Sequence, residues 1–439
     1  MMTDSFKKRL FPRIPEIARF FWPTMFGDSF PEENCALSPG FHIYDELGIR
    51  QTIKEMKGLF FTEHPGTNFF AVKACPNIEI LKIILDMGFG LDCSSPTELF
   101  RAKIAGAKPG KVMYTSNNTN PAFYPYALDI DCILNLDDIS FLDKISKVPK
   151  RICFRYNPGY KRTKGSNTII GNPPNQKYGL RDDQIERAYK MAAEKGAEIF
   201  GIHTMFVSNC RDAKVLAGNA KMLLEVVERI QDNLGFQFEF INIGGGLGIK
   251  YKPRTRELDL GLMARLINEA LNDFKARRGY VPKLYLESGR YVTGPHGVFV
   301  TPVLNVMNKY KKFIGIGSCD AADVFRLIMY PAYHQVSIVD KYGVEKRKGL
   351  KEIVSIVGPL CENLHMVSDR RLPVIKEGDY VVVQDTGAHG IAMSMTYNNW
   401  TPSQELLLKP DDSIVRISRA GTIGDLLIRE MEYKSAILK

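Results

Sequence analysis

The sequence contains no CxxC pair, and its cysteines and histidines do not repeat at the paired spacing of a metal site. A zinc site and a disulfide framework are therefore not expected, and the sequence predicts no metal centre. The 8 cysteines are scattered, several of them within apolar strand-like runs such as RICFRYN at 151–157. A free thiol behaves there as a small hydrophobic side chain. This cysteine usage is typical of the reducing cytoplasm.

Long hydrophobic runs are also missing. No apolar stretch approaches the roughly 18 residues of a membrane-spanning helix, so we expect no membrane partner. The first residues combine basic and aromatic side chains, but Pro12, Pro15 and Pro23 interrupt them. We expect residues 1–40 to form an irregular arm packed beside the C-terminal domain. A membrane-surface helix is the alternative.

The excess of positive charge is small for the length of the chain. Lysine and arginine number 59 against 49 aspartates and glutamates, a net charge of +10 over 439 residues. This balance favours small anionic ligands and only weakly nucleic acid. The basic clusters are scattered and lack interleaved aromatic residues, so we expect no nucleic-acid partner.

The chain does contain a regular alternation of strand-length apolar runs with helix-period segments. The eight runs are FFAVKA (69–74), GFGLDC (88–93), VMYTS (112–116), CILNL (132–136), RICFRYN (151–157), FGIHTMF (200–206), FINIGGG (240–246) and KLYLESG (283–289). Their apolar character on both faces indicates strands covered on both sides. The alternation predicts an α/β fold, a (β/α)8 barrel over residues 41–295. Short β-rich runs then predict an all-β domain over 296–439.

Barrel enzymes carry their active sites at the carboxyl ends of the strands. Lys73 ends an apolar run, where partial desolvation would lower its pKa and make it a Schiff-base nucleophile. A rim lysine that reaches water is the alternative. Glycines 244–246 offer unobstructed backbone amides to a phosphate, and Glu287 and Arg290 close the last strand. A lysine, a phosphate cradle and a carboxylate at one barrel mouth are what pyridoxal phosphate requires.

Eight motifs extend this interpretation. FFAVKACPN, GFGLDCSSPTEL, RYNPG, KYGL, NIGGGLG, LESGRYV, GPLCEN and DTGAHGIAMSMTYN follow one another between about residues 40 and 410. In order and spacing they resemble the motifs of the fold-type III decarboxylases that use pyridoxal 5'-phosphate. The likeness is strongest to the diaminopimelate decarboxylases.

The resemblance implies a role for each matching residue. Lys73 would carry the cofactor as a Schiff base, and Glu287 would pair with the pyridine nitrogen. The remaining cofactor-binding positions are Asp92, Arg155, His203, Met205, Ser208, Gly244, Gly245, Gly246, Arg290 and Tyr397. Active sites of this family form between two subunits, which implies a homodimer. Cys361 and Glu362 would enter the partner's site, with Cys361 as the acid that protonates the carbanion.

The same comparison addresses the substrate. Arg326 and Tyr330 match positions that engage the distal carboxylate of diaminopimelate, and Glu362 completes the substrate pocket. A guanidinium pairs with a carboxylate in a bidentate contact that a diamine cannot make. The resemblance therefore implies decarboxylation of meso-diaminopimelate or a close relative.

Several positions depart from the family's motifs. Met205 replaces the second histidine of HxHxGS, and Val207 replaces its glycine. Trp400 stands where an arginine of YNSRPR is usual, and His389 where a tyrosine is usual. These departures keep three alternatives open: a decarboxylase of another amino acid, a catalytically silent cofactor-binding paralogue, and a racemase. Racemases of this class use arginine at the pyridine nitrogen, so Glu287 argues against the last.

Overall fold

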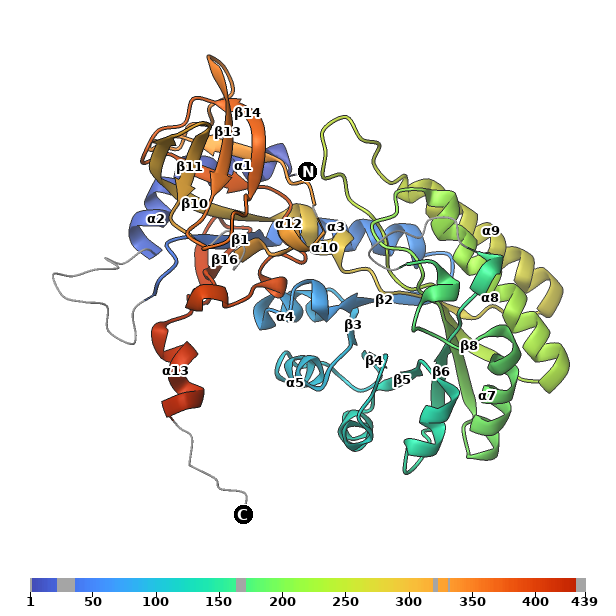
Figure 1. Cartoon of the computed structure of the whole chain (residues 1–439). Helices are drawn as coiled ribbons and strands as arrows, with labels where there is room; N and C mark the ends of the chain where they lie inside the picture. The colour runs from blue at the N-terminus through green and yellow to red at the C-terminus, as the bar shows by residue number, and fades with distance from the viewer. Residues whose placement is uncertain (1, 22–35, 163–170, 319–322, 331, 432–439) are drawn as a thin grey trace. The chain divides into compact units, whose positions relative to one another are not determined.

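A computed structural model describes residues 2–21, 36–162, 171–318, 323–330 and 332–431 of the chain (Figure 1). It divides the chain into two compact units. One comprises Ile49–Lys250 and Arg254–Val292, and the other comprises Met1–Gly48, Tyr251–Pro253 and Thr293–Lys439.

The first unit is the predicted barrel. Its described residues form a closed ring of parallel strands, β2 (Gly66–Ala71), β3 (Gly90–Cys93), β4 (Val112–Ser116), β5 (Ile133–Leu136), β6 (Arg151–Arg155), β7 (Ile199–His203), β8 (Phe238–Asn242) and β9 (Lys283–Leu286). The ring closes where Gly66 of β2 pairs with Leu284 of β9. All eight predicted strands are confirmed.

Helix α3 (Glu46–Phe60) precedes the first barrel strand. The other helices of this unit follow the strands and are α4 (Ile78–Asp86), α5 (Pro96–Ile104), α6 (Tyr124–Asp129), α7 (Asp182–Glu194), α8 (Ala213–Leu234), α9 (Leu260–Arg278) and the short α10 (Arg290–Thr293). Asp212 caps the start of α8, and Gly235 ends it at φ 73°, a conformation that glycine adopts without strain. The segment after β5 was predicted as a helix, but Ile139–Lys144 forms a tighter 3-10 turn.

Five of the eight strands, β2, β6, β7, β8 and β9, end earlier than the apolar runs that predicted them. The run at 69–74 leaves the ladder after Ala71, and Lys73 lies in a 3-10 turn, Val72–Ala74. The run at 240–246 leaves it after Asn242, because Gly244 has φ 71° and cannot continue a strand. Lys73, Glu287 and the three glycines therefore follow the strands and leave the barrel wall, whereas Asp92, Arg155 and His203 lie in strands.

The second unit is built on a mixed sheet. Its strands are β1 (Phe41–Asp45), β10 (Gly297–Asn308), β11 (Lys312–Ile316), β12 (Val336–Val339), β13 (Lys351–Val357), β14 (Val367–Pro373), β15 (Tyr380–Val383), β16 (Gln404–Leu408) and β17 (Ile414–Ser418), with helices α12 (Arg326–Met329) and α13 (Ile423–Met431). β1 lies between antiparallel β10 and parallel β16. Residues 41–48, which the sequence placed in the barrel domain, therefore belong to this unit.

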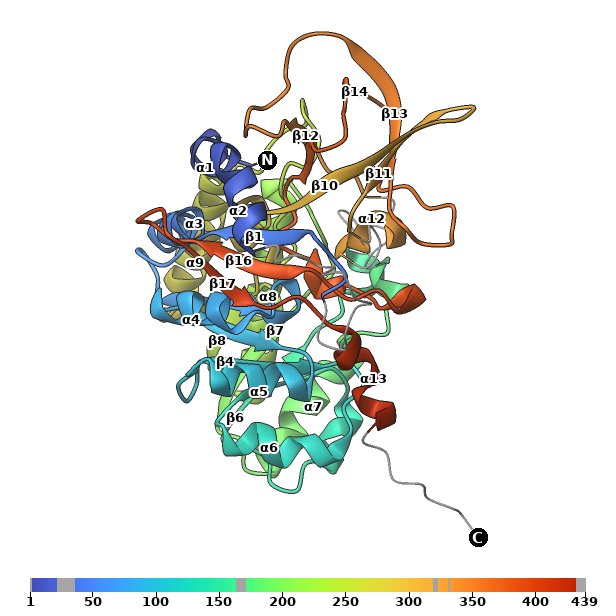
Figure 2. The same ribbon diagram turned by 90° about the vertical axis from the view of Figure 1, so that its left-hand side faces the viewer.

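The N-terminal arm is helical, so the prediction of an irregular arm is wrong. Helices α1 (Asp4–Leu10) and α2 (Ile14–Phe21) run beside β1 and β16 (Figure 2). Phe6, Leu10 and Ile14 are fully buried in a cluster that includes residues of those strands. Pro12 lies in a 3-10 turn between the helices, where its missing N–H costs nothing; Pro23 lies outside the described residues. None of the described helices has the length and hydropathy to cross a bilayer.

The barrel interior gives a test of its packing. A Cβ placed on Gly201 of β7 would lie 2.0 Å from the Phe240 ring, which fills this space. We expect Gly201→Ala to destabilise the protein by about 1–3 kcal/mol through overpacking, measured as a lower urea midpoint. The control is Gly58→Ala in α3, where nothing lies within 4 Å of the added methyl. Alanine favours a helix, so this variant should match or exceed wild-type stability; equal losses in both variants would contradict the packing argument.

Candidate active site

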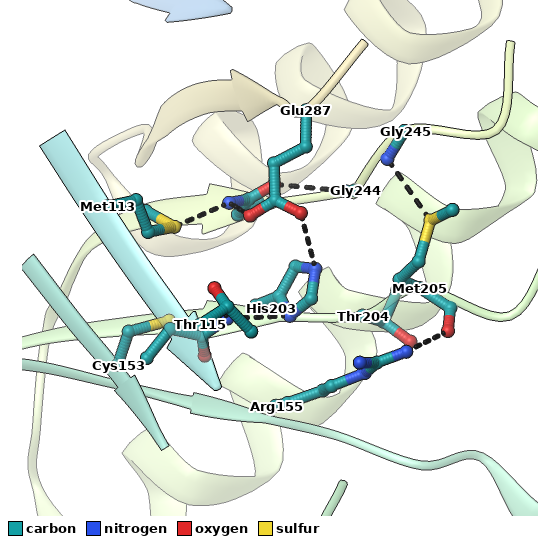
Figure 3. Close-up of polar contacts among 12 residues, drawn as sticks. Met113, Thr115, Cys153, Arg155, His203, Thr204, Met205, Gly244, Gly245 and Glu287 are labelled. Carbon is teal, nitrogen blue, oxygen red and sulfur yellow. Dashed lines mark hydrogen bonds and ion pairs between the residues drawn. The ribbon is translucent and has the colours of Figure 1, made fainter. Parts of the chain in front are cut away.

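A buried carboxylate, Glu287, lies at the centre of the polar residues that follow the barrel strands (Figure 3). Its Oε1 accepts a hydrogen bond from Asn242 Nδ2 at 2.8 Å. Its Oε2 lies 3.2 Å from His203 Nε2. His203 ends β7 and Asn242 ends β8. Because neighbouring parallel strands end at the same edge, three consecutive strands deliver this group together.

A second carboxylate, Asp92 in β3, is buried beside them. Burial and the charge of Glu287 raise its pKa well above the usual value, although Lys73 opposes the shift. Burial also opposes the ionisation of Glu287, but His203, Lys73 and Asn242 outweigh it and lower the pKa of that group. Of two coupled acids in one site, Asp92 therefore takes the proton and Glu287 keeps the charge.

The Lys73 side chain is exposed, so the predicted partial desolvation is wrong. The amine instead lies in the field of three carboxylates, Asp92, Glu98 and Glu287. Lys73 emerges from a turn whose other residues, Val72 and Ala74, are buried. The apolar neighbours in the sequence anchor the turn, and the lysine itself points away from them.

Sequence reasoning missed Glu98 as a site residue. It lies in the first turn of α5, where its amide donates to Ser95 Oγ at 3.2 Å and its carboxylate accepts from the amide of Ser94 at 2.6 Å. Ser95 is the N-cap of this helix, and its side chain and the preceding amide of Ser94 both hold Glu98. These contacts fix a half-buried carboxylate whose pKa is raised by burial within the field of Lys73.

The three glycines after β8 form a tight turn against backbone. A Cβ on Gly244, Gly245 or Gly246 would lie 2.4, 2.4 and 2.5 Å from carbonyl oxygens of neighbouring loops. Only glycine fits there. The amides are not all open, however. Gly244 donates to Asn242 Oδ1 at 2.9 Å, and Gly245 N lies 3.2 Å from Met205 Sδ.

Met205 and Arg155 are tied together beside this turn (Figure 3). Arg155 donates to the Met205 carbonyl at 2.7 Å, lies 3.5 Å from Asp137, and stacks on the Tyr178 ring at 4.4 Å. The guanidinium therefore holds the loop after β7 in place through the Met205 carbonyl. The side chain of Val207 contributes to the wall against Gly246.

Two further predicted cofactor residues lie at the rim of the barrel. Ser208 follows the loop after β7, and Arg290 begins α10; both are half-buried. Arg290 is preceded by Gly289, where a Cβ would lie 2.8 Å from that of Ala74. The last loop is thus packed against the turn that carries Lys73.

The second unit contains the other predicted residues in two clusters. In the first, Cys361 Sγ lies 3.4 Å from Glu362 Oε2 and 3.7 Å from Tyr397 Oη. Tyr397 also donates to Glu362, and Asn398 Oδ1 accepts from the Cys361 amide at 3.0 Å. The cluster is exposed. The resemblance made Tyr397 a cofactor-binding position and placed Cys361 and Glu362 in the partner's site. In the structure all three residues lie together in one subunit.

Arg326 forms the second cluster. It is 4% exposed, and its Nη1 lies 2.7 Å from His334 Nε2. His334 Nδ1 lies 2.6 Å from the carbonyl of Gln384, so Nδ1 carries the proton and Nε2 accepts from the guanidinium. The guanidinium also stacks on Tyr251 at 4.3 Å. Tyr330 ends α12 and is half-buried.

Comparisons with known proteins identify the barrel. Residues 48–294 match the family described as pyridoxal-dependent decarboxylase, pyridoxal binding domain. The chain belongs to the pyridoxal-dependent decarboxylases. The predicted enzyme class and the cofactor, pyridoxal phosphate, are thereby confirmed.

Relatives of this decarboxylase match over most of its length. Protein TabA of Pseudomonas amygdali pv. tabaci is 36% identical, covering 97% of this chain and 95% of its own. A diaminopimelate decarboxylase of Methanothermobacter thermautotrophicus is 30% identical, covering 91% and 92%. The crystal structure of a diaminopimelate decarboxylase from M. jannaschii in complex with L-lysine has a TM-score of 0.81 at 25% identity, covering 89% and 91%.

The barrel of this decarboxylase fits its cofactor. Glu287 is a buried carboxylate with a lowered pKa, as a partner of a protonated ring nitrogen requires, and the three glycines bring backbone without side chains to the end of the barrel. Asp92 Oδ1 is buried without a hydrogen-bond partner among the described residues, as expected of an acid that awaits another polar group. Lys73 would hold the cofactor, with Glu287 on its ring nitrogen and Gly245, Gly246 and Arg290 near its phosphate.

The raised pKa of Asp92 makes stability depend on pH in a defined direction. The folded protein retains this proton at pH values where the unfolded chain has lost it, so Asp92 destabilises the fold as pH rises above about 3.9. Asp92→Asn keeps the shape without the charge. In cofactor-free protein it should raise Tm by roughly 2–4 °C at pH 8, with the gain shrinking towards pH 4.

The control for this variant is Asp183→Asn. Asp183 is exposed, and its hydrogen bond with Arg181 lowers its pKa. Its substitution should leave Tm nearly unchanged or slightly lower at pH 8. A gain for Asp92→Asn that stays constant between pH 8 and pH 5 would mean that its carboxyl group is not protonated in the fold.

Proposed function

We propose that this enzyme decarboxylates an α-amino acid that carries a distal carboxylate, meso-diaminopimelate or a close relative. The observation that carries the proposal is the placement of Glu287, a buried carboxylate that accepts a hydrogen bond from Asn242 and lies 3.2 Å from His203 at the barrel mouth. Relatives named diaminopimelate decarboxylase, which align along almost the whole chain, support the substrate class.

The barrel residues have separate tasks in this proposal. Pyridoxal phosphate, when bound, supplies an electron sink for the carbanion left by the departing CO2. Glu287 would hold a proton at its ring nitrogen. Lys73 would hold the cofactor through its side-chain amine. Asp92, protonated and buried, adds no second negative charge that would compete with Glu287.

We also propose a homodimer with shared sites, working in the cytoplasm. Cys361, Glu362 and Tyr397 are exposed and already joined by hydrogen bonds within one subunit, so they can enter a partner's site as one group. Cys361 would then donate the proton that replaces CO2. The free thiols of the buried Cys93, Cys132 and Cys153 support a reducing compartment.

The residues proposed to hold the tail of the substrate favour a second candidate substrate. Arg326 is buried, and His334 and Tyr251 hold its guanidinium. A guanidinium so engaged has fewer donors for a distal carboxylate, and Trp400 supplies no cation in its place. These features favour a relative of diaminopimelate with a different or more apolar tail as the alternative substrate.

The decisive experiment measures released CO2 and amine product from the enzyme with pyridoxal phosphate. The panel holds meso-diaminopimelate, D- and L-lysine, ornithine and arginine. We expect turnover of meso-diaminopimelate, reduced about 10²- to 10³-fold in Glu287→Gln because the ring nitrogen loses its charged partner. Glu239→Gln, which removes a carboxylate paired with Arg151 outside the site, is the control. Cofactor binding with no CO2 from any compound would refute the proposed substrate class.

Shared sites predict complementation between two inactive variants. Co-expressed Lys73→Ala and Cys361→Ala subunits should pair at random, and each mixed dimer would hold one intact site. The mixture should recover about a quarter of wild-type activity. Each variant alone should stay inactive. Absence of recovery from a proven mixed dimer would mean that each subunit completes its own site.

A further inference from the structure

His203 is enclosed between two polar residues at the end of β7. Its side chain is 1% exposed and lies beside Glu287 (Figure 3). Asn135 of β5 contacts the other nitrogen of the ring. Asn135 Nδ2 lies 2.8 Å from His203 Nδ1 and 3.0 Å from Thr115 Oγ1. On the opposite side of the ring, Glu287 Oε2 lies 3.2 Å from Nε2.

The contact with Asn135 fixes the proton of the imidazole. An amide nitrogen can only donate, so His203 Nδ1 must accept and carries no hydrogen. The ring proton therefore resides on Nε2, the atom nearest Glu287. A doubly protonated ring would place an N–H against the N–H of Asn135, so the same contact disfavours the imidazolium. Among the described residues, Nε2 has no conventional hydrogen-bond partner, which leaves Glu287 as its polar neighbour.

We propose that His203 is a positioning residue for Glu287: a neutral imidazole, held by Asn135 with its proton on Nε2, that orients the carboxylate and supports its charge without neutralising it. An imidazolium would compete with the cofactor's ring nitrogen for that charge. A neutral donor leaves the full negative charge available to it. Asn242 serves the other oxygen in the same way, since its amide is also an uncharged donor.

This inference rests on the proposed cofactor chemistry, and a cofactor analogue separates it from a merely structural role. In 1-deazapyridoxal phosphate a carbon replaces the ring nitrogen, so the analogue cannot pair with Glu287. Wild-type enzyme should bind pyridoxal phosphate more tightly than the analogue. His203→Leu should reduce this preference about tenfold, because the carboxylate loses the polar N–H that lies 3.2 Å from it. His203→Gln, which keeps an N–H donor, should retain most of it.

The two dissociation constants, measured by equilibrium dialysis, decide the outcome. If His203 has only a structural role, His203→Leu should weaken the binding of both cofactors equally. If His203 has no role, both dissociation constants should stay unchanged. Either result overturns the proposal. Equal affinity of the wild-type enzyme for both cofactors would instead refute the pairing of Glu287 with the ring nitrogen.

The tautomer is tested without any cofactor. In ¹⁵N-histidine-labelled protein at pH 7, one of the 7 histidines should show a protonated Nε2 and an unprotonated Nδ1, with this signal missing in His203→Gln. Asn135→Asp offers an acceptor in place of the amide donor and should move a proton onto Nδ1. An imidazolium or an Nδ1–H tautomer for His203 in the wild-type protein would overturn the proposal even if the enzyme binds its cofactor.

Discussion

The buried charge of Glu287 is the constraint on which the rest of the site depends. A carboxylate taken out of water loses several kcal/mol of hydration, so it remains ionised only where donors and a cation replace the water. Asn242 and His203 supply the donors, and Lys73 supplies the cation. Burial and the charge of Glu287 both oppose ionisation of the second acid, Asp92, and together they raise its pKa. One buried anion thus contributes to the protonation of its neighbour.

The barrel explains how these groups meet. Lys73, Asp92, His203, Asn242 and Glu287 follow or end five different strands, and their spacing in sequence gives no local contact. Parallel strands in a closed ring all end at one rim, so short departures from the ladder bring the side chains together. The rim is rigid because glycines 244–246 pack against carbonyls of the adjacent loops. Preorganised dipoles of this kind need no rearrangement when charge develops.

The sequence alone predicted the eight strands because each is buried on both faces and reads as an apolar run. It placed Lys73, Asp92 and Glu287 at the barrel rim for the same reason. It could not predict that Asn135 fixes a histidine tautomer, because a single asparagine in an apolar strand carries no sign of its partner across the barrel. It also missed that β1 joins the second sheet, since strand pairing over more than 250 residues depends on tertiary contacts. The helical arm was missed because proline is tolerated at a helix's first turn.

The contacts among Asn135, His203 and Glu287 give a physical reason for the replacement of a histidine by Met205. A thioether is polarisable and uncharged at every pH, and here its sulfur lies against the Gly245 amide. A second imidazole at that position would add a titratable group close to Glu287 and could carry a positive charge. With methionine there, His203 is the imidazole at the carboxylate, and Asn135 keeps it neutral. With His203 neutral, Lys73 is the remaining cation among the residues that lower the pKa of Glu287. The charge chemistry of the site is then concentrated on Lys73, Glu287 and the ring nitrogen.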